Sequence, residues 1–176
     1  FKPKSFDHSI RLLINRLNWL CAARPDLEFP PLDEPAILNC LATAFEGMTL
    51  AKQAAAANVK PAFRRHMPEA QWEWLDEFAP ATIDWPDDQP KRLQYPEVSA
   101  DKHGNVQPVE LHVKLHDCFR LTEHPAICEG KHLVRFKLLT PKNKKIDFCD
   151  DWPTFKQREY PRIRKDLLAK FPGVGW

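Results

Sequence analysis

The sequence predicts an α+β fold, in which an N-terminal helical bundle is followed by a small mixed β-sheet with a hairpin and flanking helices. Apolar residues recur at helical spacing up to residue 79, alternate with a period of two over 132–139, and are interrupted by 17 prolines. Hydrophobic residues make up 43% of the chain, which is enough for a packed core. We therefore expect two domains, a helical bundle over residues 1–79 and a small α+β domain over residues 80–176.

The first predicted helix begins near residue 6 and ends before Pro25, which cannot continue it. Either Ser5 or Asp7 can cap its start through a side-chain oxygen. Its apolar residues follow the i, i+3, i+4, i+7 spacing of one helical face: Phe6, Ile10, Leu13, Ile14, Leu17, Leu20 and Cys21.

Three further helices are predicted before residue 80. Asp33 caps the second, and Gly47 suits its end. The third opens at Thr49 and runs through the alanines of residues 54–57. The fourth begins at Pro68 and ends before the next proline. The side chains expected to face inward are Ile37, Leu38, Leu41 and Phe45 on the second helix, and Trp72, Leu75 and Phe78 on the fourth.

The second half begins with short extended segments at 82–85 and 92–95 and an exposed loop at 99–105. Residues 109–120 are predicted to form an amphipathic helix, because Leu111, Leu115, Cys118 and Phe119 fit one helical face. Residues 132–139 alternate as a strand, TPKNKK forms a turn, and IDFC returns as the second strand of a hairpin. Pro161 stands in the first turn of a last helix that runs to about Lys170.

Charge is divided unevenly along the chain. Residues 131–176 hold 12 Lys and Arg against 5 Asp and Glu, a net +7, whereas the first 130 residues hold 14 against 19, a net −5. A folded domain with one basic end and no catalytic motif is most simply a binding module for polyanions.

The candidate nucleic-acid-binding residues come from this basic end. If the hairpin and the last helix pack side by side, their cations form one patch that contacts phosphates without reading bases. The alternative is a solvated lysine-rich turn and a solvated charged helix face. The candidates are Lys131, Arg135, Lys137, Lys142, Lys144, Lys145, Arg162, Arg164 and Lys165.

Other groups of residues give weaker indications of a functional site. His112 and His116 have the i, i+4 spacing of metal ligands on a helix, but no Glu follows the first His, so we expect no metal site. Nothing supplies the surroundings of a Cys–His nucleophile. Among the tryptophans at 72, 74 and 85, Trp72 fits the core, whereas Trp74 remains open as a base-stacking residue.

Five cysteines without a CxxC pair predict reduced, structural thiols and a cytoplasmic protein. No stretch approaches the roughly 20 apolar residues of a membrane span. Because the chain begins at Phe1 rather than at Met, we expect it to be a piece of a larger protein.

The order of segments from Pro68 onward resembles one family. PEAQWEWLDEFAP closes a helix before a strand, VKLHDCFRLTEHP reads as a helix followed by Leu and Pro, VRFKLLTPKNKKIDF is the hairpin, and REYPRIRKDLLAKFP is the terminal helix. Together they resemble the C-terminal region of bacterial HrpB-type ATP-dependent helicases, which are DEAH-box-like members of superfamily 2. The chain departs from the family in a longer loop at 99–105 and in the shifted positions of Trp152 and Phe155.

The resemblance implies a parent helicase whose two RecA-like motor domains use ATP and Mg²⁺ and move along nucleic acid, with RNA the expected substrate. The chain itself has no GxxxxGK[ST] loop and no DEAH-like motif, so we expect it to be non-catalytic and to bind no cofactor. We expect an accessory module that packs on the motor core, contributes non-specific nucleic-acid contact, or does both. The alternative is a protein–protein interaction module with a basic docking surface. The expected partners are the motor domains and RNA or another nucleic acid.

Overall fold

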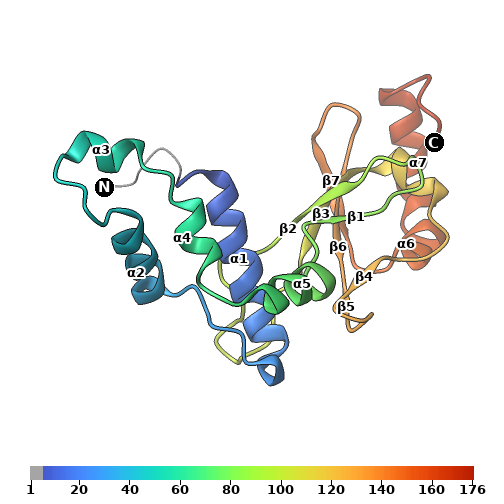
Figure 1. The fold of residues 1–176 in the computed structure, drawn as a ribbon. Helices are drawn as coiled ribbons and strands as arrows, with labels where there is room; N and C mark the ends of the chain where they lie inside the picture. The colour runs from blue at the N-terminus through green and yellow to red at the C-terminus, as the bar shows by residue number, and fades with distance from the viewer. Residues whose placement is uncertain (1–5) are drawn as a thin grey trace. The chain divides into compact units, whose positions relative to one another are not determined.

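The computed structural model describes residues 6–176 and has an α+β fold. The chain divides into two compact units (Figure 1). The helical unit comprises Phe1–Ala79 and Tyr95–Gln107, and the sheet unit comprises Pro80–Gln94 and Pro108–Trp176. The chain therefore crosses between units more than once, whereas the sequence led us to expect one division after residue 79.

The helical unit contains five α-helices and a short 3₁₀ turn within the described residues: α1 (His8–Ala23), η1 (Pro25–Leu27), α2 (Glu34–Ala44), α3 (Ala51–Ala56), α4 (Lys60–Arg64) and α5 (Glu69–Phe78). Asp7 caps α1 by accepting from the Ser9 and Ile10 amides, and Asp33 caps α2 by accepting from the Ala36 amide at 2.9 Å. Asp7 was one of the two predicted caps. The other, Ser5, lies outside the described residues. Helix α4 was not predicted.

Tertiary contacts change which side chains form the core of the helical unit. On α2, Cys40 is buried while Leu38 is 59% exposed, so the expected inward position of Leu38 is wrong. On α1, Trp19 is fully buried although it lay outside the predicted apolar face. Its indole Nε1 donates to the Gln107 carbonyl at 2.8 Å, and its ring meets Tyr95 edge to face at 5.5 Å. These contacts hold residues 95–107 in the helical unit.

Arg16 joins α1 to the end of α5. Its guanidinium donates to the Ala79 and Leu75 carbonyls and pairs with the Asp76 carboxylate. The Leu75 carbonyl also accepts from the Ala79 amide at 3.0 Å, whereas the Ala79 carbonyl lies beyond the last helical residue and takes Arg16 as its donor. The planar cation also complements the negative end of the helix dipole.

The sheet unit contains a five-stranded sheet in the order β1-β2-β3-β6-β7, in which only the β3–β6 pair is parallel. A separate ribbon pairs β4 with β5. The strands are β1 (Thr82–Ile83), β2 (Lys91–Gln94), β3 (Glu110–Lys114), β4 (Ala126–Ile127), β5 (His132–Leu133), β6 (Arg135–Leu139) and β7 (Lys145–Cys149). The helices are η2 (Leu115–Arg120), α6 (Trp152–Arg158) and α7 (Tyr160–Lys170).

The predicted helix over 109–120 is wrong. The segment forms strand β3 and then the 3₁₀ helix η2. Leu111 and Leu115 are four residues apart, but with Val113 they also alternate, and all three are buried. Pairing of β3 with β2 and β6 selects the strand. Leu115 belongs to the core as expected, whereas Phe119 is only half-buried.

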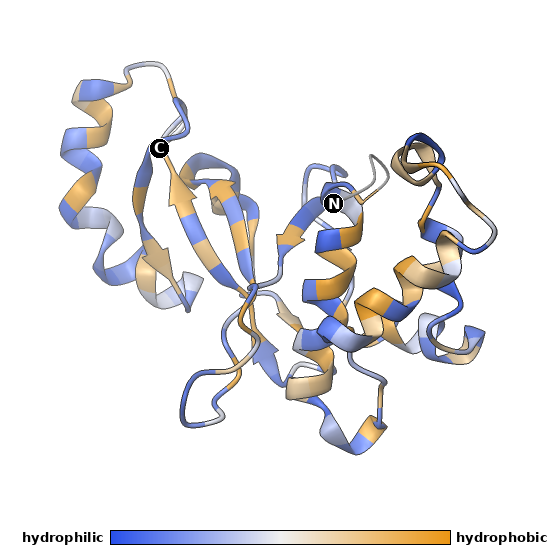
Figure 2. Cartoon of the chain, turned by 90° about the vertical axis from the view of Figure 1, so that its left-hand side faces the viewer, coloured by the Kyte–Doolittle hydropathy of each residue, from blue (hydrophilic) through white to orange (hydrophobic). Residues whose placement is uncertain are grey.

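The predicted hairpin and terminal helix are confirmed as β6–β7 and α7. Residues 132 and 133 do not join the hairpin, because β5 pairs with β4. Helix α6, which begins at Trp152, was not predicted. Along β6, Phe136 and Leu138 are buried and alternate with half-buried residues, and Figure 2 shows the corresponding alternation of hydropathy along the strands.

His124 links three parts of the sheet unit. Its Nε2 lies 2.6 Å from the Val134 carbonyl oxygen, its Nδ1 accepts from the Trp152 amide at 2.9 Å, and its ring lies on Phe136 with centroids 4.5 Å apart. A carbonyl only accepts and an amide N–H only donates, so the ring is neutral with its proton on Nε2. Burial lowers the pKa of His124, against the opposing effects of the Val134 carbonyl and of Asp151 and Asp150.

All five cysteines lie among the described residues, and none of them is in a disulfide bond. Burial raises the pKa of Cys21 and Cys149 to about 11, and it also raises the pKa of Cys118 and Cys40. Since the thiolate is the reactive form, these four side chains are unreactive near neutral pH in the folded chain.

We expect acid to destabilise the sheet unit through His124. The unfolded side chain has a pKa of about 6.5, so the unfolded state binds more protons below that pH and the free energy of unfolding falls. Urea unfolding followed by tryptophan fluorescence should show a lower midpoint at pH 5.5 than at pH 7.5. His124→Ala should lower the free energy of unfolding at pH 7.5 by about 2–4 kcal/mol, because it removes two hydrogen bonds and the packing of the ring.

The His124→Ala variant should also show a smaller loss of stability between the two pH values. The control is His103→Ala, at an exposed loop position, which should unfold as wild type does. Part of the acid effect will persist in every variant, because burial also lowers the pKa of His132. If His124→Ala loses as much stability between pH 7.5 and pH 5.5 as wild type does, protonation of His124 does not cause the acid effect.

Thiol titration with Ellman's reagent should report five thiols in the denatured, non-reduced chain. The folded chain should react much more slowly at neutral pH. A denatured count of three would reveal a disulfide and contradict the free-thiol arrangement.

Candidate nucleic-acid interface

The β6–β7 turn presents the tip lysines, which are Lys142, Lys144 and Lys145, to solvent. The Thr140 amide donates to the Lys144 carbonyl at 2.8 Å, and the Lys144 amide donates to the Thr140 hydroxyl at 3.1 Å. Asn143 takes a left-handed conformation with φ 59°, which Asn tolerates better than most residues. The turn is therefore ordered, and its lysines project from a defined backbone.

The five-stranded sheet has a buried face and a face that we call the open face. Leu93, Leu111, Phe136 and Cys149 lie on the buried face, where Trp85 and His124 contact Phe136. Strand alternation and register place the following residues on the open face: Arg92, Gln94, Glu110, His112, Lys114, Arg135, Lys137, Leu139, Lys145, Phe148 and Asp150. All are exposed or half-buried.

Three of the candidate cations meet around Phe148 on this open face. Lys137 is the cross-strand partner of Phe148, the Lys145 Nζ lies 3.7 Å from its ring centroid, and the Arg135 guanidinium carbon lies 5.7 Å from it. Arg135 also donates to both Asp150 carboxylate oxygens, at 2.7 and 3.1 Å, and this pairing raises the pKa of Arg135. Arg135 is thus fixed, whereas the two lysines keep their charge available to a ligand.

The cations of α7 lie on another surface. Tyr160, at the start of α7, packs edge to face on Phe119 of η2 at 4.8 Å, and Phe119 also meets Trp152. Burial, and next the neighbouring Cys149, raise the pKa of the Cys118 thiol of η2, and Cys149 faces the buried side of the sheet. Helix α7 therefore packs on the side of the buried face. The structure does not join its cations to those of the open face in one patch.

Two of the remaining candidates are already paired. Arg162 on α7 lies 3.2 Å from Glu159, and Lys131 in the β4–β5 turn lies 3.1 Å from Glu129. Arg164 and Lys165 are exposed on α7. Among the described residues, no ion pair within 4.0 Å is formed by Lys137, Lys142, Lys144, Lys145, Arg164 or Lys165.

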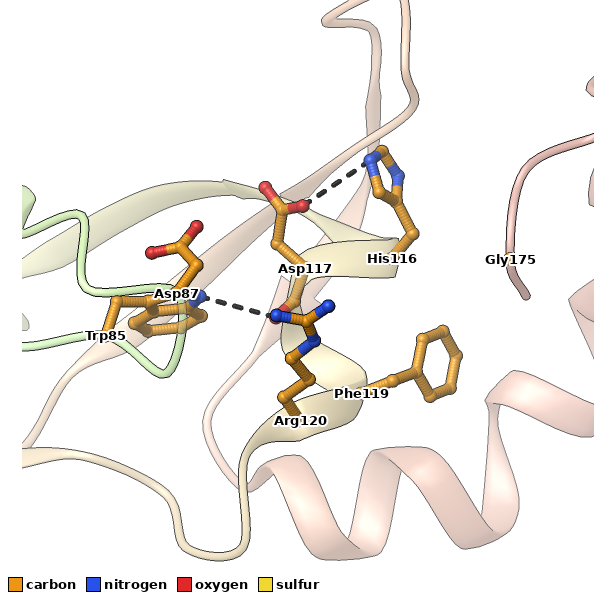
Figure 3. Close-up of a pocket in the computed structure, with 7 residues that line it drawn as sticks. All are labelled: Trp85, Asp87, His116, Asp117, Phe119, Arg120 and Gly175. Atoms are coloured by element: carbon orange, nitrogen blue, oxygen red, sulfur yellow. Dashed lines mark hydrogen bonds and ion pairs between the residues drawn. The ribbon is translucent and has the colours of Figure 1, made fainter.

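A pocket of about 480 Å³ lies between η2, the turn after Trp85 and the C-terminal residues (Figure 3). Its polar groups are partly engaged, since His116 Nε2 lies 3.5 Å from the Asp117 carboxylate and the Trp85 indole donates to the Asp117 carbonyl at 3.3 Å. Asp87, Asp117 and Arg120 all line this pocket, and the Asp87 carboxylate is already paired with Lys91 at 3.0 Å. This mixture of charges does not favour a phosphate group.

The structure also gives the positions of the histidines and tryptophans that the sequence suggested as candidate site residues. His112 lies on β3 and His116 on η2, so they do not share a helix face. Within residues 6–176, no group of three or more His, Cys, Asp or Glu side chains is placed to hold a metal ion. Trp72 and Trp85 are buried, whereas Trp74 is 44% exposed on α5 beside Glu73 and Glu77.

Sequence reasoning missed Phe148. It is 38% exposed, although phenylalanine on a strand is usually taken for a core residue. The only local sign was that it stands one residue before Cys149, whose side chain takes the buried side of the same strand.

Comparisons with known proteins agree with this fold. The family described as "ATP-dependent helicase C-terminal", of the HrpB type, matches residues 40–176. The chain belongs to this HrpB-type helicase C-terminal family. The ATP-dependent RNA helicase HrpB of Escherichia coli strain K12 is 23% identical over 167 residues, covering 92% of this chain and 20% of the relative.

Two solved structures share the fold. The crystal structure of the E. coli DExH-box NTPase HrpB has a TM-score of 0.82 at 20% identity, and that of the E. coli DEAH/RHA helicase HrpB has a TM-score of 0.73 at 19% identity. Each alignment covers 97% of this chain, and the chain spans about a fifth of each of these proteins. The phosphate-binding loop of a motor domain is absent from its sequence. No helix in the described part of the chain is long and apolar enough to cross a membrane.

Proposed function

We propose that this C-terminal helicase module adds non-specific nucleic-acid contact to an ATP-dependent helicase through the cations of its β6–β7 hairpin. The observation that carries the proposal is the cluster of exposed tip lysines, which form no ion pair within the described residues. One of them, Lys145, lies over Phe148, the cross-strand partner of Lys137 on the open face. Clustered Lys and Arg bind phosphate backbones by releasing condensed counterions. The RNA helicase relative supports RNA as the nucleic acid.

The contact is expected to be to phosphates and to carry no sequence information. Lysine ammonium groups on flexible side chains act as point charges, and they do not present the rigid fork of donors that reads base edges. The exposed lysines and the lack of base-reading donors at the turn both fit an accessory role. In this role the parent's motor domains supply ATP-dependent movement and this module adds affinity for nucleic acid.

We expect neutralisation of the tip lysines to weaken RNA binding for all sequences alike. The variant Lys142→Gln/Lys144→Gln/Lys145→Gln is compared with wild type by fluorescence anisotropy on single-stranded RNA at several salt concentrations. The slope of log affinity against log salt should become shallower by up to about 0.7 for each phosphate that is no longer neutralised. The matched control, Lys52→Gln/Arg65→Gln/Lys102→Gln, removes three exposed cations from the helical unit and should retain the wild-type slope. Wild-type behaviour of the tip variant would identify the tip as a solvated turn.

A protein-docking role is the second candidate, and apolar exposure in the helical unit favours it. Leu38 on α2 and Leu50 at the start of α3 are 59% and 62% exposed. Met48 between these helices is also exposed. Three exposed apolar side chains within 13 residues fit a surface that packs against the motor domains.

If this surface docks on the motor, Leu38→Ser/Leu50→Ser should weaken binding to separately produced motor domains in the absence of RNA. Since roughly half of each leucine is already covered, each substitution is worth about 1 kcal/mol, which together is a roughly 10- to 30-fold change in Kd. Isothermal titration calorimetry measures it, with Val98→Ser as an exposed apolar control elsewhere in the unit. Equal affinities for wild type and the double variant would exclude this docking surface.

A further inference from the structure

Phe148 is an aromatic ring set among cations on a solvent-facing sheet. The edge strand β7 carries it, and its neighbour on β6 in the register is Lys137. On its other side β6 pairs in parallel with β3, and there Lys137 is the partner of His112. Phe148 thus stands beside a row of polar, cationic or titratable side chains rather than beside other exposed apolar groups.

We propose that the open face of the sheet binds single-stranded nucleic acid by stacking a base on Phe148, with Lys137 and Lys145 contacting the flanking phosphates. This inference rests on the proposed nucleic-acid role. It adds a specific binding site and a preference for single-stranded over double-stranded nucleic acid, neither of which the tip lysines alone define. An exposed aromatic side chain on a sheet gives a base a flat surface to stack on, and nearby cations follow the backbone of the strand.

Charge complementarity favours a polyanion over a protein as the occupant. The open face carries five Lys and Arg but only two carboxylates, Glu110 and Asp150. Asp150 is held by Arg135, and Glu110 lies 3.2 Å from His112. The centre of a protein–protein interface is depleted in charged side chains, whereas here the single exposed aromatic side chain is flanked by them.

The strand must be single, because stacking requires an unpaired base with a free π-face. The bases of an intact duplex are already stacked on one another. In the free chain Lys145 lies over the Phe148 ring. An exposed cation–π contact is weaker than the stacking of a base on an aromatic side chain, so a base displaces this flexible ammonium toward the adjacent phosphate.

The test measures the affinity of the full 176-residue chain for labelled oligouridine and for a blunt RNA duplex by fluorescence anisotropy at low salt. Phe148→Ala should weaken oligouridine binding roughly 5- to 100-fold, which is the range for removal of one stacked base. Phe148→Trp should restore it, and Phe148→Leu, which keeps an apolar side chain without a π-face, should not. Duplex binding should be insensitive to all three substitutions. Trp74→Ala, which removes an exposed aromatic ring from the acidic surface of α5, is the control and should bind as wild type does.

Cross-linking gives a readout independent of affinity. Oligouridine carrying 4-thiouridine, irradiated at long wavelength, should cross-link to Phe148, as mapped by mass spectrometry, and the cross-link should disappear in Phe148→Leu. Circular dichroism of each variant confirms that the sheet is folded.

The outcomes separate this inference from the proposed function. If Phe148→Ala binds oligouridine as wild type does while the triple tip variant loses affinity, the stacking site is wrong and the phosphate contact stands. If Phe148→Ala loses affinity but Lys142→Gln/Lys144→Gln, which leaves Lys145 beside Phe148 in place, does not, the stacking site stands and the tip contact is wrong. If wild type binds neither RNA at low salt, both are wrong.

Discussion

The sheet unit depends on a neutral imidazole at its centre. His124 accepts from the first amide of α6 and donates to the carbonyl that precedes β6, and its ring covers Phe136. One side chain thereby fixes the entrance of the hairpin and the start of the helix that follows it. The arrangement works only while the imidazole is uncharged, because a second ring proton would face the Trp152 amide donor and leave it without an acceptor.

This constraint determines which face of the sheet remains available for binding. With His124, Trp85 and η2 covering the buried face, α6 and α7 pack on that side through Trp152 and Tyr160. The other face carries long polar side chains that alternate with the core residues of the same strands and are exposed or half-buried. The basic character of the C-terminal residues is therefore divided between two surfaces, and the aromatic ring of Phe148 lies among the cations of the open face.

The helical unit is stabilised by several separate contacts rather than by one central side chain. Its core is held by side-chain hydrogen bonds that reach across the chain, such as Arg16 to the end of α5 and Trp19 to Gln107. The Asn18 amide group both donates to and accepts from the backbone of Leu32, at 3.0 and 2.8 Å. These contacts fix helices too short to be stable alone, while apolar side chains at α2 and at the start of α3 remain exposed. These exposed side chains form the surface that we propose to pack against the motor domains.

Local patterns in the sequence determined much of the fold. Asp7 and Asp33 signal helix starts, the alternation over 134–138 with a TPKNKK turn specifies the hairpin, and Pro161 marks the last helix. The exposed lysines of the turn follow from the same pattern, since a hairpin tip lies in solvent. The uneven charge also needs no structure to be seen. Each of these features depends on residues close together in the chain, which is why they are readable from the sequence.

Only the tertiary structure decided the state of residues 109–120 and the surroundings of Phe148. Leu111, Val113 and Leu115 satisfy two spacings at once, and the choice of strand came from pairing with β6, which lies more than 20 residues later. Likewise, Phe148 turns outward because Cys149 pairs with Phe136 on the buried face, and register cannot be read from one strand alone. Contacts between residues distant in sequence selected among locally acceptable alternatives, and they placed the α7 cations apart from those of the hairpin.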